Sequence, residues 1–355
     1  MKSLGNFPDP FIAEISGQPE AIRRAAAGLE EQSAALSRLE EASPDRRVIF
    51  TGMGSSYDAC YPAVAALARA GVVAIHVDAA ELLHFRGALL TPTTLLVAVS
   101  QSGESAEVVR VIELVDRDAG ALVLGVTNGH DNTLARSSTL ALDTRAGSEL
   151  GPSTMTFAGS LVVLAAVGRV LTGEPPADAV RTLAGASEEA AAAIERLLER
   201  PGLADELAQR LDRHGAMVIL GRGPARAAAE MGALTVKEAV GIPVESLQTA
   251  QFRHGPLELA GPDLAAIVIA TEPETRDLDL ALAGELVGSG ASVAVVSEDG
   301  AGPDGSLRVD VGPLDRSLAP AVSILPAQLL AWRLAVSRGR APGAYVRASK
   351  VTTRE

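Results

Sequence analysis

The chain has 355 residues, enough to build two domains with full hydrophobic cores. Hydrophobic residues make up 47% of it and aromatic residues only 3%, a globular α/β composition whose core is expected to consist of alanine, valine and leucine. The formal net charge of −13 argues against nucleic acid or an anionic membrane as the main partner. The single cysteine, Cys60, excludes an intramolecular disulfide framework and fits a reducing compartment.

The N-terminal segment shows no export signal, because Asp9 and Glu14 stand where a signal peptide would keep an apolar core. The longest apolar run, near Leu161–Val167, is too short to span a bilayer. We therefore expect a cytoplasmic protein with no membrane partner.

Residues 1–44 are interpreted as an N-terminal helical arm. Pro19 is typical of a first helical residue, and a helix with mixed charges on its outer face is expected over Ala21–Ala42. A first α/β domain is expected over residues 45–175, where short apolar strands alternate with helices, as in a parallel sheet with right-handed crossovers. Its expected strands are Arg47–Phe50, Val72–Val77, Leu95–Val99, Gly120–Gly129 and Leu140–Thr144.

The second half of the chain repeats the first. Residues 218–223 parallel residues 48–54, and residues 290–296 parallel residues 120–126, both at an offset near 170, which indicates duplicated domains. A helical linker over residues 176–213, interrupted at Pro201-Gly202, should lead into a second domain at 214–340. Residues 341–355 then form a C-terminal tail.

The segment Ser100–Ser105, with sequence SQSGES, lies between a buried strand and a helix start and is called the serine loop below. The first amides of a helix carry the positive end of its dipole, so serine hydroxyls beside them suit a phosphate group. Serines that merely cap the helix are the alternative, and the loop alone leaves both open. The counterpart in the second half, Ala270–Thr275, contains two acids and a proline, so only the first half is expected to bind phosphate.

Three further candidates lie in the second half. Glu230 and Glu238 share one face of a predicted helix, where desolvation would raise a carboxylate pKa and suit a general base. An ordinary solvated pair of Lys237 and Glu238 is the simpler interpretation from these residues alone. His254 precedes a Gly-Pro turn, and Lys350 lies near the end of the chain.

Each of the last two also has an ordinary explanation. His130 lies in a similar polar turn, so position does not single out His254, and a lysine near a terminus is commonly solvated. Metal and nucleophile chemistry find no support, since HExxH, GxSxG and a Cys/His cluster are missing from the sequence. Cys60, in an apolar helix, is expected to be inert, and no cofactor is expected.

Taken together, these segments resemble the sugar isomerase (SIS) superfamily. The resemblance runs from Glu14–Pro19 to the last residues and depends on SQSGE, VKE, HGPL and SKVT in that order. It is strongest to the isomerase half of glutamine-fructose-6-phosphate aminotransferase and to stand-alone amino-sugar-phosphate deaminase/isomerases. It implies two tandem SIS domains, each a parallel sheet flanked by helices in a flavodoxin-like or Rossmann-like three-layer sandwich. The glutaminase domain of the synthases, and with it a built-in ammonia source, is not found in the sequence.

The resemblance also implies site residues. Glu238 matches the base that moves a proton between C1 and C2 of the sugar, and His254 matches a ring-opening histidine supplied by the neighbouring subunit. Lys350 matches the tail lysine that acts on the ketose carbonyl. The implied sugar-phosphate contacts are Ser56, Ser100, Gln101, Ser102, Ser105, Ser153 and Ser349.

Several positions depart from the synthase pattern, and all of them lie close to the expected substrate. Thr235 stands where the synthases carry a lysine, Gln251 replaces a glutamate, and Met155-Thr156 replace Lys-Ala. Lys350 also abuts Val351 directly, where the synthases place one residue between the lysine and the Val-Thr pair. The exact sugar and the direction of reaction therefore stay open.

The resemblance implies an isomerase/deaminase that interconverts a 2-amino-2-deoxyhexose 6-phosphate with a ketohexose 6-phosphate and ammonia. The expected partners are a phosphorylated amino sugar and a second copy of the chain, in a homodimer with shared active sites; pairing of dimers into tetramers stays open. Two alternatives keep the fold: a deglycase acting on fructosamine phosphates, and a non-catalytic sugar-phosphate-binding protein.

Overall fold

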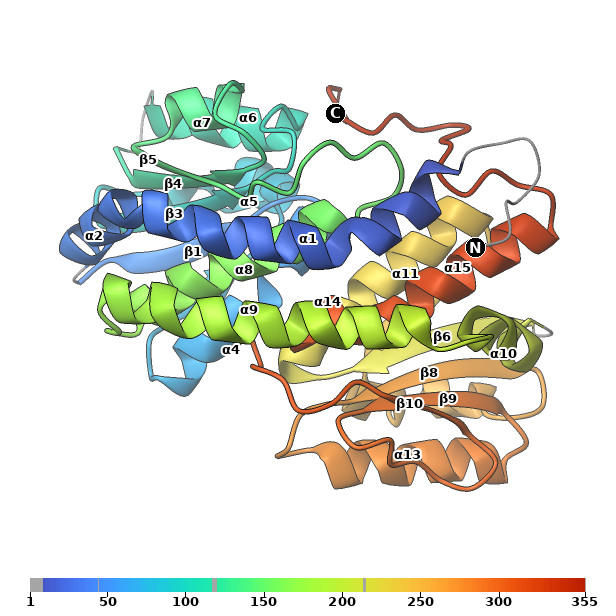
Figure 1. Cartoon of the computed structure of the whole chain (residues 1–355). Coiled ribbons are helices and arrows are strands. Elements are labelled where there is room, and N and C mark those ends of the chain that lie inside the picture. The colour runs from blue at the N-terminus through green and yellow to red at the C-terminus, as the bar shows by residue number, and fades with distance from the viewer. Residues whose placement is uncertain (1–8, 44, 117–119, 213–214, 355) are drawn as a thin grey trace. The chain divides into compact units, whose positions relative to one another are not determined.

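The computed structural model describes residues 9–43, 45–116, 120–212 and 215–354. Two five-stranded sheets organise the chain, in the orders β2-β1-β3-β4-β5 and β10-β9-β8-β6-β7, with all neighbouring strands parallel. Helices flank each sheet (Figure 1), so the predicted α/β class with two parallel sheets is confirmed. The strands are β1 Arg47–Thr51, β2 Ala74–His76, β3 Thr94–Val99, β4 Leu122–Thr127, β5 Leu140–Asp143, β6 Ala216–Gly221, β7 Glu245–Gln248, β8 Leu264–Ala270, β9 Ser292–Ser297 and β10 Leu307–Asp310.

The two sheets have the same topology. Read from β7, the second sheet runs β7-β6-β8-β9-β10, which matches the first sheet strand for strand. Corresponding strands begin at residues 47 and 216, 94 and 264, and 122 and 292. The internal repeat seen in the sequence is therefore a repeat of the fold.

Contacts within the chain define two compact units. The first unit contains the first sheet and consists of Glu20–Ser148, Met155–Glu188 and Arg347–Glu355. The second unit contains the second sheet and consists of the residues up to Pro19, Glu149–Thr154 and Glu189–Val346. The C-terminal tail is thus shared, since its start belongs to the second unit and its end to the first.

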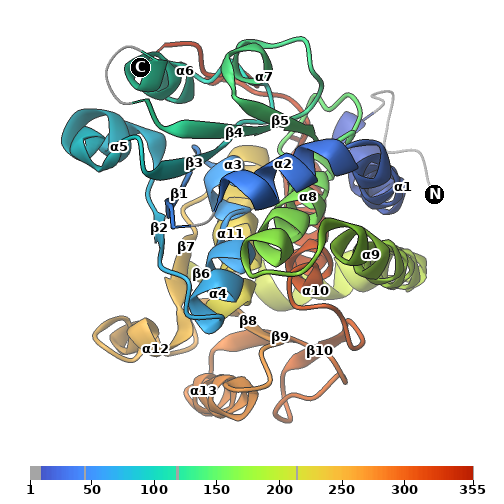
Figure 2. The same ribbon diagram turned by 90° about the vertical axis from the view of Figure 1, so that its left-hand side faces the viewer.

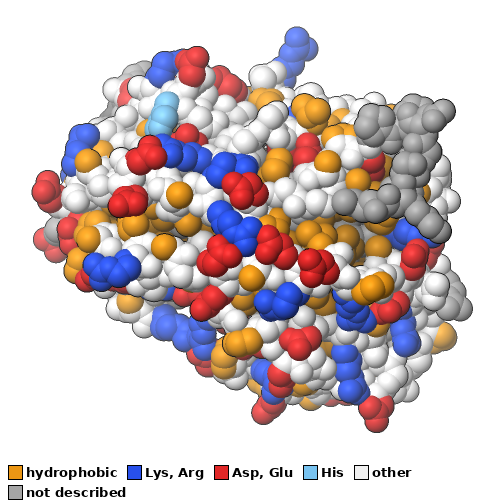
Figure 3. Space-filling view, in the orientation of Figure 1, with side chains coloured by type: hydrophobic (Ala, Val, Ile, Leu, Met, Phe, Trp, Pro, Cys, Tyr) orange, Lys and Arg blue, Asp and Glu red, His pale blue; other side chains and the backbone are white. Residues whose placement is uncertain are grey.

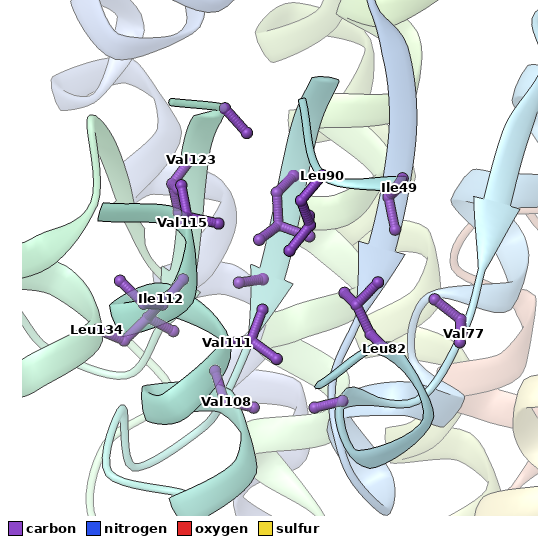
Figure 4. Close-up of a cluster of buried hydrophobic side chains, with 14 residues drawn as sticks. Ile49, Val77, Leu82, Leu90, Val108, Val111, Ile112, Val115, Val123 and Leu134 are labelled. Atoms are coloured by element: carbon purple, nitrogen blue, oxygen red, sulfur yellow. The ribbon is translucent and has the colours of Figure 1, made fainter. Parts of the chain in front are cut away.

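Apolar side chains on one face of each sheet pack against helices. In the first unit, Ile49 and Val123 of the sheet share a buried cluster with Leu82 and Val111 from two helices (Figure 4). In the second unit, a corresponding cluster joins β8 to helix α13. Every residue of β3 and of β8 is buried, as expected of central strands covered on both faces. Burial of each valine or leucine contributes about 1.5–3 kcal/mol.

Most helices follow the alternation with strands expected from the sequence. In the first half they are α1 Pro10–Glu31, α2 Ser33–Ala42, α3 Ser55–Asp58, α4 Tyr61–Arg69, α5 Ala79–Phe85, α6 Ala106–Leu114, α7 Thr133–Ser137 and α8 Met155–Leu171. In the second half they are α9 Pro176–Glu199, α10 Leu203–Leu211, α11 Arg226–Val240, α12 Thr249–Phe252, α13 Arg276–Gly288, α14 Ala319–Ser323 and α15 Leu325–Ser337. Residues 1–8 of the predicted arm and Arg213, the predicted end of the linker helix, lie outside the described residues.

The predicted helix start at Pro19 is wrong, because α1 begins at Pro10 and contains Pro19. A proline inside a helix leaves the carbonyl four residues earlier without its usual donor. Here the side-chain amide of Gln18 replaces that donor, with Nε2 3.1 Å from the carbonyl oxygen of Ile15. The same Nε2 also lies 2.9 Å from Oε1 of Gln328 on α15, and both glutamines are fully buried.

The predicted interruption of the linker helix is confirmed. Helix α9 ends at Glu199 and α10 begins at Leu203, and Gly202 between them has a φ of +78°. This left-handed backbone conformation favours glycine, which explains the break at that position.

One long apolar helical stretch is a core element. Among the described residues, residues 319–337 alone combine the length and hydropathy needed to cross a membrane, and 83% of that stretch is buried within the fold. On the surface, acidic and basic side chains lie next to one another in both units (Figure 3). Arg145 with Glu31 and Arg200 with Glu206 are two such exposed pairs, which contribute little to stability.

Candidate functional site

The serine loop joins β3 to α6 in the first unit. Its tight course depends on Gly103, which has a φ of +65°. A Cβ atom at this position would lie 1.9 Å from the side-chain oxygen of Asn132. The loop therefore has the shape that the glycine in the motif was expected to provide, with backbone and hydroxyl donors next to the helix start.

The serine hydroxyls of the loop hold the loop together. Ser100 Oγ lies 3.0 Å from Ser105 Oγ and accepts a hydrogen bond from the amide of Gly103 at 3.2 Å. Ser102 Oγ accepts from the amide of Glu104 at 3.1 Å. Ser105 is the N-cap residue of α6, yet among the described residues its side chain makes no capping hydrogen bond. Helix capping alone therefore does not account for these serines.

A second glycine loop meets the serine loop. Ser56 lies in α3, after β1, and its Oγ accepts a hydrogen bond from the amide of Gln101 at 3.3 Å. A Cβ atom on Gly52 would lie 2.9 Å from the carbonyl oxygen of Val99, so only glycine allows this approach. Strands β2 and β3 lie on opposite sides of β1, so the strand order switches between β1 and β3. The two loops follow β1 and β3 and meet at this switch point, where α/β proteins commonly bind ligands.

The serine loop is held in place by hydrogen bonds to three residues that the sequence did not single out, namely Thr127, Asn132 and Thr133. Both carboxylate oxygens of Glu104 are engaged by Thr133, one by its amide at 2.7 Å and the other by its hydroxyl at 2.8 Å. Asn132 donates through Nδ2 to the hydroxyl of Thr127, which in turn donates to the carbonyl oxygen of Gln101 at 3.3 Å. Asn132 was detectable only as a helix-capping residue, a role it also fills for α7.

The end of the tail belongs to the same unit as the serine loop. The first amide of α6, that of Ala106, donates to the carbonyl oxygen of Thr352 at 3.1 Å, and Figure 2 shows the end of the chain beside α6. Lys350 is half-buried two residues earlier, rather than fully solvated. Ser349 is exposed, and its hydroxyl donates to the carbonyl oxygen of Val351 at 2.6 Å.

The candidate base and histidine lie in the second unit. Glu238 is half-buried on α11, whereas the neighbouring Lys237 is exposed. Glu230 has a different role, since Arg226 donates to it at 2.9 Å and Ser246 also donates to it. His254 is exposed in the turn that follows α12.

Ser153 lies in a short segment, residues 149–154, that is tied at both ends. The Glu149 carboxylate accepts from the amide and the hydroxyl of Thr154, at 2.8 and 3.0 Å. The Glu14 carboxylate accepts from the amides of Leu150 and Gly151, at 2.5 and 3.1 Å. Glu14 belongs to the motif that carried the family resemblance, but no role was predicted for it.

Tyr345 completes this arrangement and was not anticipated. Its hydroxyl donates to the carbonyl oxygen of Gly151 at 3.2 Å. Burial raises the pKa of Tyr345, and the negative charges of Glu238, Glu149 and Glu14 raise it further. The hydroxyl therefore stays a protonated donor.

The corresponding loop of the second unit lacks the serine network. Glu272, 4% exposed, stands there instead. Arg222 is engaged by buried Asp279, with Nε 2.8 Å from Oδ1. Buried carboxylates at this position disfavour an anion, which supports the expectation that phosphate binds in the first half.

Possible metal ligands and the single thiol are the other reactive groups of the chain. Within the part of the chain that the structure describes, no group of three or more His, Cys, Asp or Glu side chains could hold a metal ion. Cys60 is fully buried, its pKa is raised chiefly by that burial, and its thiol donates to the carbonyl oxygen of Ser56 at 3.3 Å. A thiol of this kind is a poor nucleophile.

The predicted site residues are divided between the two units. The first unit contains Ser56, Ser100, Gln101, Ser102, Ser105, Ser349 and Lys350. The second unit contains Ser153, Glu238 and His254.

Two parallel three-layer halves with a serine loop at the switch point of the first define the SIS class of protein. The SIS domain family matches residues 42–168 and 211–338, and the chain belongs to this family.

The chain is similar to two glutamine-fructose-6-phosphate aminotransferases (isomerizing). It is 31% identical to the protein of Pyrobaculum aerophilum over 363 residues, which cover 100% of this chain and 59% of that protein. It is 32% identical to the protein of Aeropyrum pernix over 373 residues, which cover 99% of this chain and 58% of that protein. The chain therefore spans less than two thirds of the length of these relatives.

Solved structures share the fold. The C-terminal domain of glucosamine-fructose-6-phosphate aminotransferase from Francisella tularensis superposes with a TM-score of 0.80 at 23% identity, covering 94% of this chain and 97% of that one. Glucosamine-6-phosphate deaminase from Thermotoga maritima superposes with a TM-score of 0.72 at 20% identity, covering 96% of this chain and 99% of that one. The chain is thus related to the glutamine-fructose-6-phosphate aminotransferases over part of their length, and it shares its fold with these solved structures.

Proposed function

We propose that this protein is an amino-sugar-phosphate isomerase/deaminase. It would interconvert a 2-amino-2-deoxyhexose 6-phosphate, such as glucosamine 6-phosphate, with fructose 6-phosphate and ammonia. The observation that carries the proposal is the serine loop, where five polar residues surround the start of α6 at a sheet switch point. Membership of the SIS family and similarity to the aminotransferases support the choice of substrate.

The phosphate contacts fix the register of the sugar. Ser56, Ser100, Gln101, Ser102 and Ser105 would hold the phosphate at C6, five carbons away from C1. Binding energy from that remote group would orient C1 and C2 for reaction. Ser153 and Ser349 would contact sugar hydroxyls.

The chemistry needs one base and two assisting groups. His254, supplied by a neighbouring subunit, would assist ring opening. Glu238 would then take the proton from C2 and return it at C1, which converts the amino aldose into a ketose imine. The Lys350 amine then adds to the imine carbon and ammonia leaves, and one water molecule hydrolyses the resulting lysine imine to the ketone.

Lys350 would act on the ketose carbonyl at C2. In the synthetic direction its neutral amine adds to this carbonyl of the ring-opened ketose, and loss of one water molecule gives an imine between Lys350 and C2. Ammonia then adds to C2 and the lysine amine leaves, which gives the ketose imine and restores free Lys350. The deaminating direction follows the same steps in reverse. Half-burial beside the serine loop reduces the contact of the lysine with bulk water. This placement suits an amine that must be uncharged to react.

A shared active site requires a homodimer, because the histidine is proposed to come from a second copy of the chain. The exposure of His254 fits this role, since a side chain that serves a partner must be accessible in the single subunit. A cytoplasmic location fits the intracellular phosphosugar substrate.

A direct assay tests the proposal. The protein is incubated with glucosamine 6-phosphate, and ammonia and fructose 6-phosphate are measured, with the sugar lacking its phosphate as the control. We expect turnover of the phosphorylated sugar only. Binding of the phosphosugar without turnover, and without exchange of solvent deuterium at C1 or C2, would instead indicate a non-catalytic binding protein.

A deglycase acting on fructosamine 6-phosphates is the second candidate. It is favoured by Thr235, which is fully buried one turn before Glu238, at the position where the synthases carry a lysine. Loss of that cation changes the surroundings of the substrate nitrogen. A panel of fructosamine phosphates with different amine substituents separates the two, because a deglycase releases the substituted amine and a hexose phosphate.

A further inference from the structure

In the second unit, the backbone amide and the backbone carbonyl of Gly151 are both hydrogen-bonded to side chains. Its amide donates to Glu14, 3.1 Å from Oε2, and its carbonyl oxygen accepts from the hydroxyl of Tyr345 at 3.2 Å. Glu14 comes from α1 and is 7% exposed, while Tyr345 comes from the tail. Three segments far apart in the sequence therefore meet at one residue, and we call this meeting point the Gly151 junction.

Close packing makes the junction specific. A Cβ atom on Gly151 would lie 2.9 Å from Glu14 Oε2 and 3.3 Å from the Cα atom of Gly343. A Cβ atom on Gly343 would lie 2.6 Å from Pro10 and 3.1 Å from the amide nitrogen of Phe11. Two glycines thus permit the tail, residues 149–154 and the start of α1 to approach within contact distance, and side chains at either position would separate them.

We propose that Tyr345 is a positioning residue. Its hydrogen bond fixes the point where the tail that carries Lys350 leaves the second unit, and it also fixes the segment that presents Ser153. The part of this inference that concerns catalysis rests on the proposed function, since it takes Lys350 and Ser153 as substrate contacts. Tyr345 itself acts through Gly151 and the tail.

The tail has two tethers, one on either side of Lys350. Tyr345 precedes the lysine by five residues, and Thr352, bound to the amide of Ala106, follows it by two. Five extended residues span at most about 17 Å, so a fixed Tyr345 limits the positions that the lysine can reach. Removal of either tether enlarges that range and lowers the fraction of time in which the amine is aligned for reaction.

The charges around the junction keep the tyrosine in its hydrogen-bonding state. Burial, followed by the charges of Glu238, Glu149 and Glu14, raises the pKa of Tyr345, so the hydroxyl remains protonated throughout the neutral range. One anchor therefore serves the segment that carries Ser153 and the start of the lysine tail.

The test removes a single hydroxyl group. Tyr345→Phe keeps the ring but loses the hydrogen bond to Gly151, and Val346→Ala, at a neighbouring residue that is 80% exposed, is the matched control. Hydrogen–deuterium exchange of the full-length protein is followed in peptides that cover residues 149–154 and 346–354. Loss of one hydrogen bond should speed exchange in both peptides by about five- to tenfold in Tyr345→Phe, with no change in Val346→Ala.

Turnover of glucosamine 6-phosphate is measured on the same samples. We expect kcat to fall by about tenfold in Tyr345→Phe with KM nearly unchanged, because the phosphate contacts of the first unit are intact. Faster exchange in Tyr345→Phe supports the positioning role even if the wild-type protein turns over no amino sugar phosphate, an outcome that would reject the proposed function alone. Unchanged exchange in both peptides overturns the inference, whatever the activity. Glu14→Gln, which retains one acceptor oxygen, provides a second variant and should speed exchange in residues 149–154.

Discussion

The amide of Ala106 donates a hydrogen bond to the carbonyl oxygen of Thr352 at 3.1 Å, so the first turn of α6 holds the end of the tail as well as the serine loop. A helix leaves its first amides without internal partners, and this one is satisfied by a segment from the other end of the chain. The contact places the residues around Lys350 in the unit that contains the proposed phosphate site. A phosphosugar held by the serines would therefore meet the tail from within the same unit.

Lys350→Met should lower kcat for glucosamine 6-phosphate by about 10²-fold, because it removes the amine proposed to add at C2 and a loss of this size is typical of removing one catalytic group. Affinity for fructose 6-phosphate, measured as the rise in melting temperature with ligand, should change little because the serines remain. Arg354→Met, at an exposed position in the same tail, is the control and should retain full activity. Equal turnover in the two variants would remove Lys350 from the mechanism.

Glu238→Gln should lower the rate of proton transfer by about 10²- to 10⁴-fold, since the amide keeps the shape of the side chain but accepts no proton. The measurement is solvent deuterium entering C1 or C2 of the sugar, followed by NMR. The exposed neighbour Lys237 provides the comparison, because Lys237→Gln should be nearly as active as wild type. If the two variants lose activity to the same extent, the pair is an ordinary surface feature and Glu238 is not the base.

Gly103→Ala should abolish phosphate-dependent stabilisation. The new Cβ would collide with Asn132, and the φ of +65° disfavours any side chain there by about 1–2 kcal/mol. Gly185→Ala is the matched glycine variant, since Gly185 lies inside α9 with no atom within 4 Å of a Cβ. That change should raise stability by about 0.5–1 kcal/mol. Thermal melts with and without fructose 6-phosphate distinguish the two, and normal ligand stabilisation of Gly103→Ala would contradict the assigned role of the loop.

The sequence predicted the central strands and the serine loop because each has a strong local pattern. Residues 95–99 form a continuous apolar run of strand length, and a buried strand in a parallel sheet has that composition. By contrast, β7 has the sequence ESLQ and lies at the edge of its sheet, where one side needs no apolar cover. Its polar composition gave no strand pattern, and only pairing with β6 reveals it.

Tertiary contacts explain what the sequence could not indicate. Helix α1 continues through Pro19 because the side chain of Gln18 supplies the missing hydrogen-bond donor. No local rule for proline anticipates a side chain that replaces the backbone donor. Tyr345 becomes significant only because Gly343 and Gly151 allow the tail to reach residues 149–154. Side chains that act through backbone atoms of distant segments have no signature in a single sequence.

Arg222→Met should destabilise the protein by about 3–5 kcal/mol at pH 7, because it leaves Asp279 buried with its partner removed. Burial already raises the pKa of Asp279 above its ordinary value of 3.8. The folded state therefore keeps a proton at pH values where the unfolded chain has released it, and stability should recover as the pH falls through that raised pKa. Urea unfolding followed by the fluorescence of Trp332, the only tryptophan, measures this in the same unit.

The double variant Arg222→Met with Asp279→Asn is the control for this pH dependence. Asparagine keeps the size of the aspartate and can still accept the hydrogen bond that Thr275 donates at 3.1 Å, but it carries no charge. It should restore part of the lost stability at pH 7 and show no recovery on acidification. If Arg222→Met is as stable as wild type at pH 7, Arg222 does not compensate the buried charge of Asp279. The expected preference of phosphate for the first unit would then need another explanation.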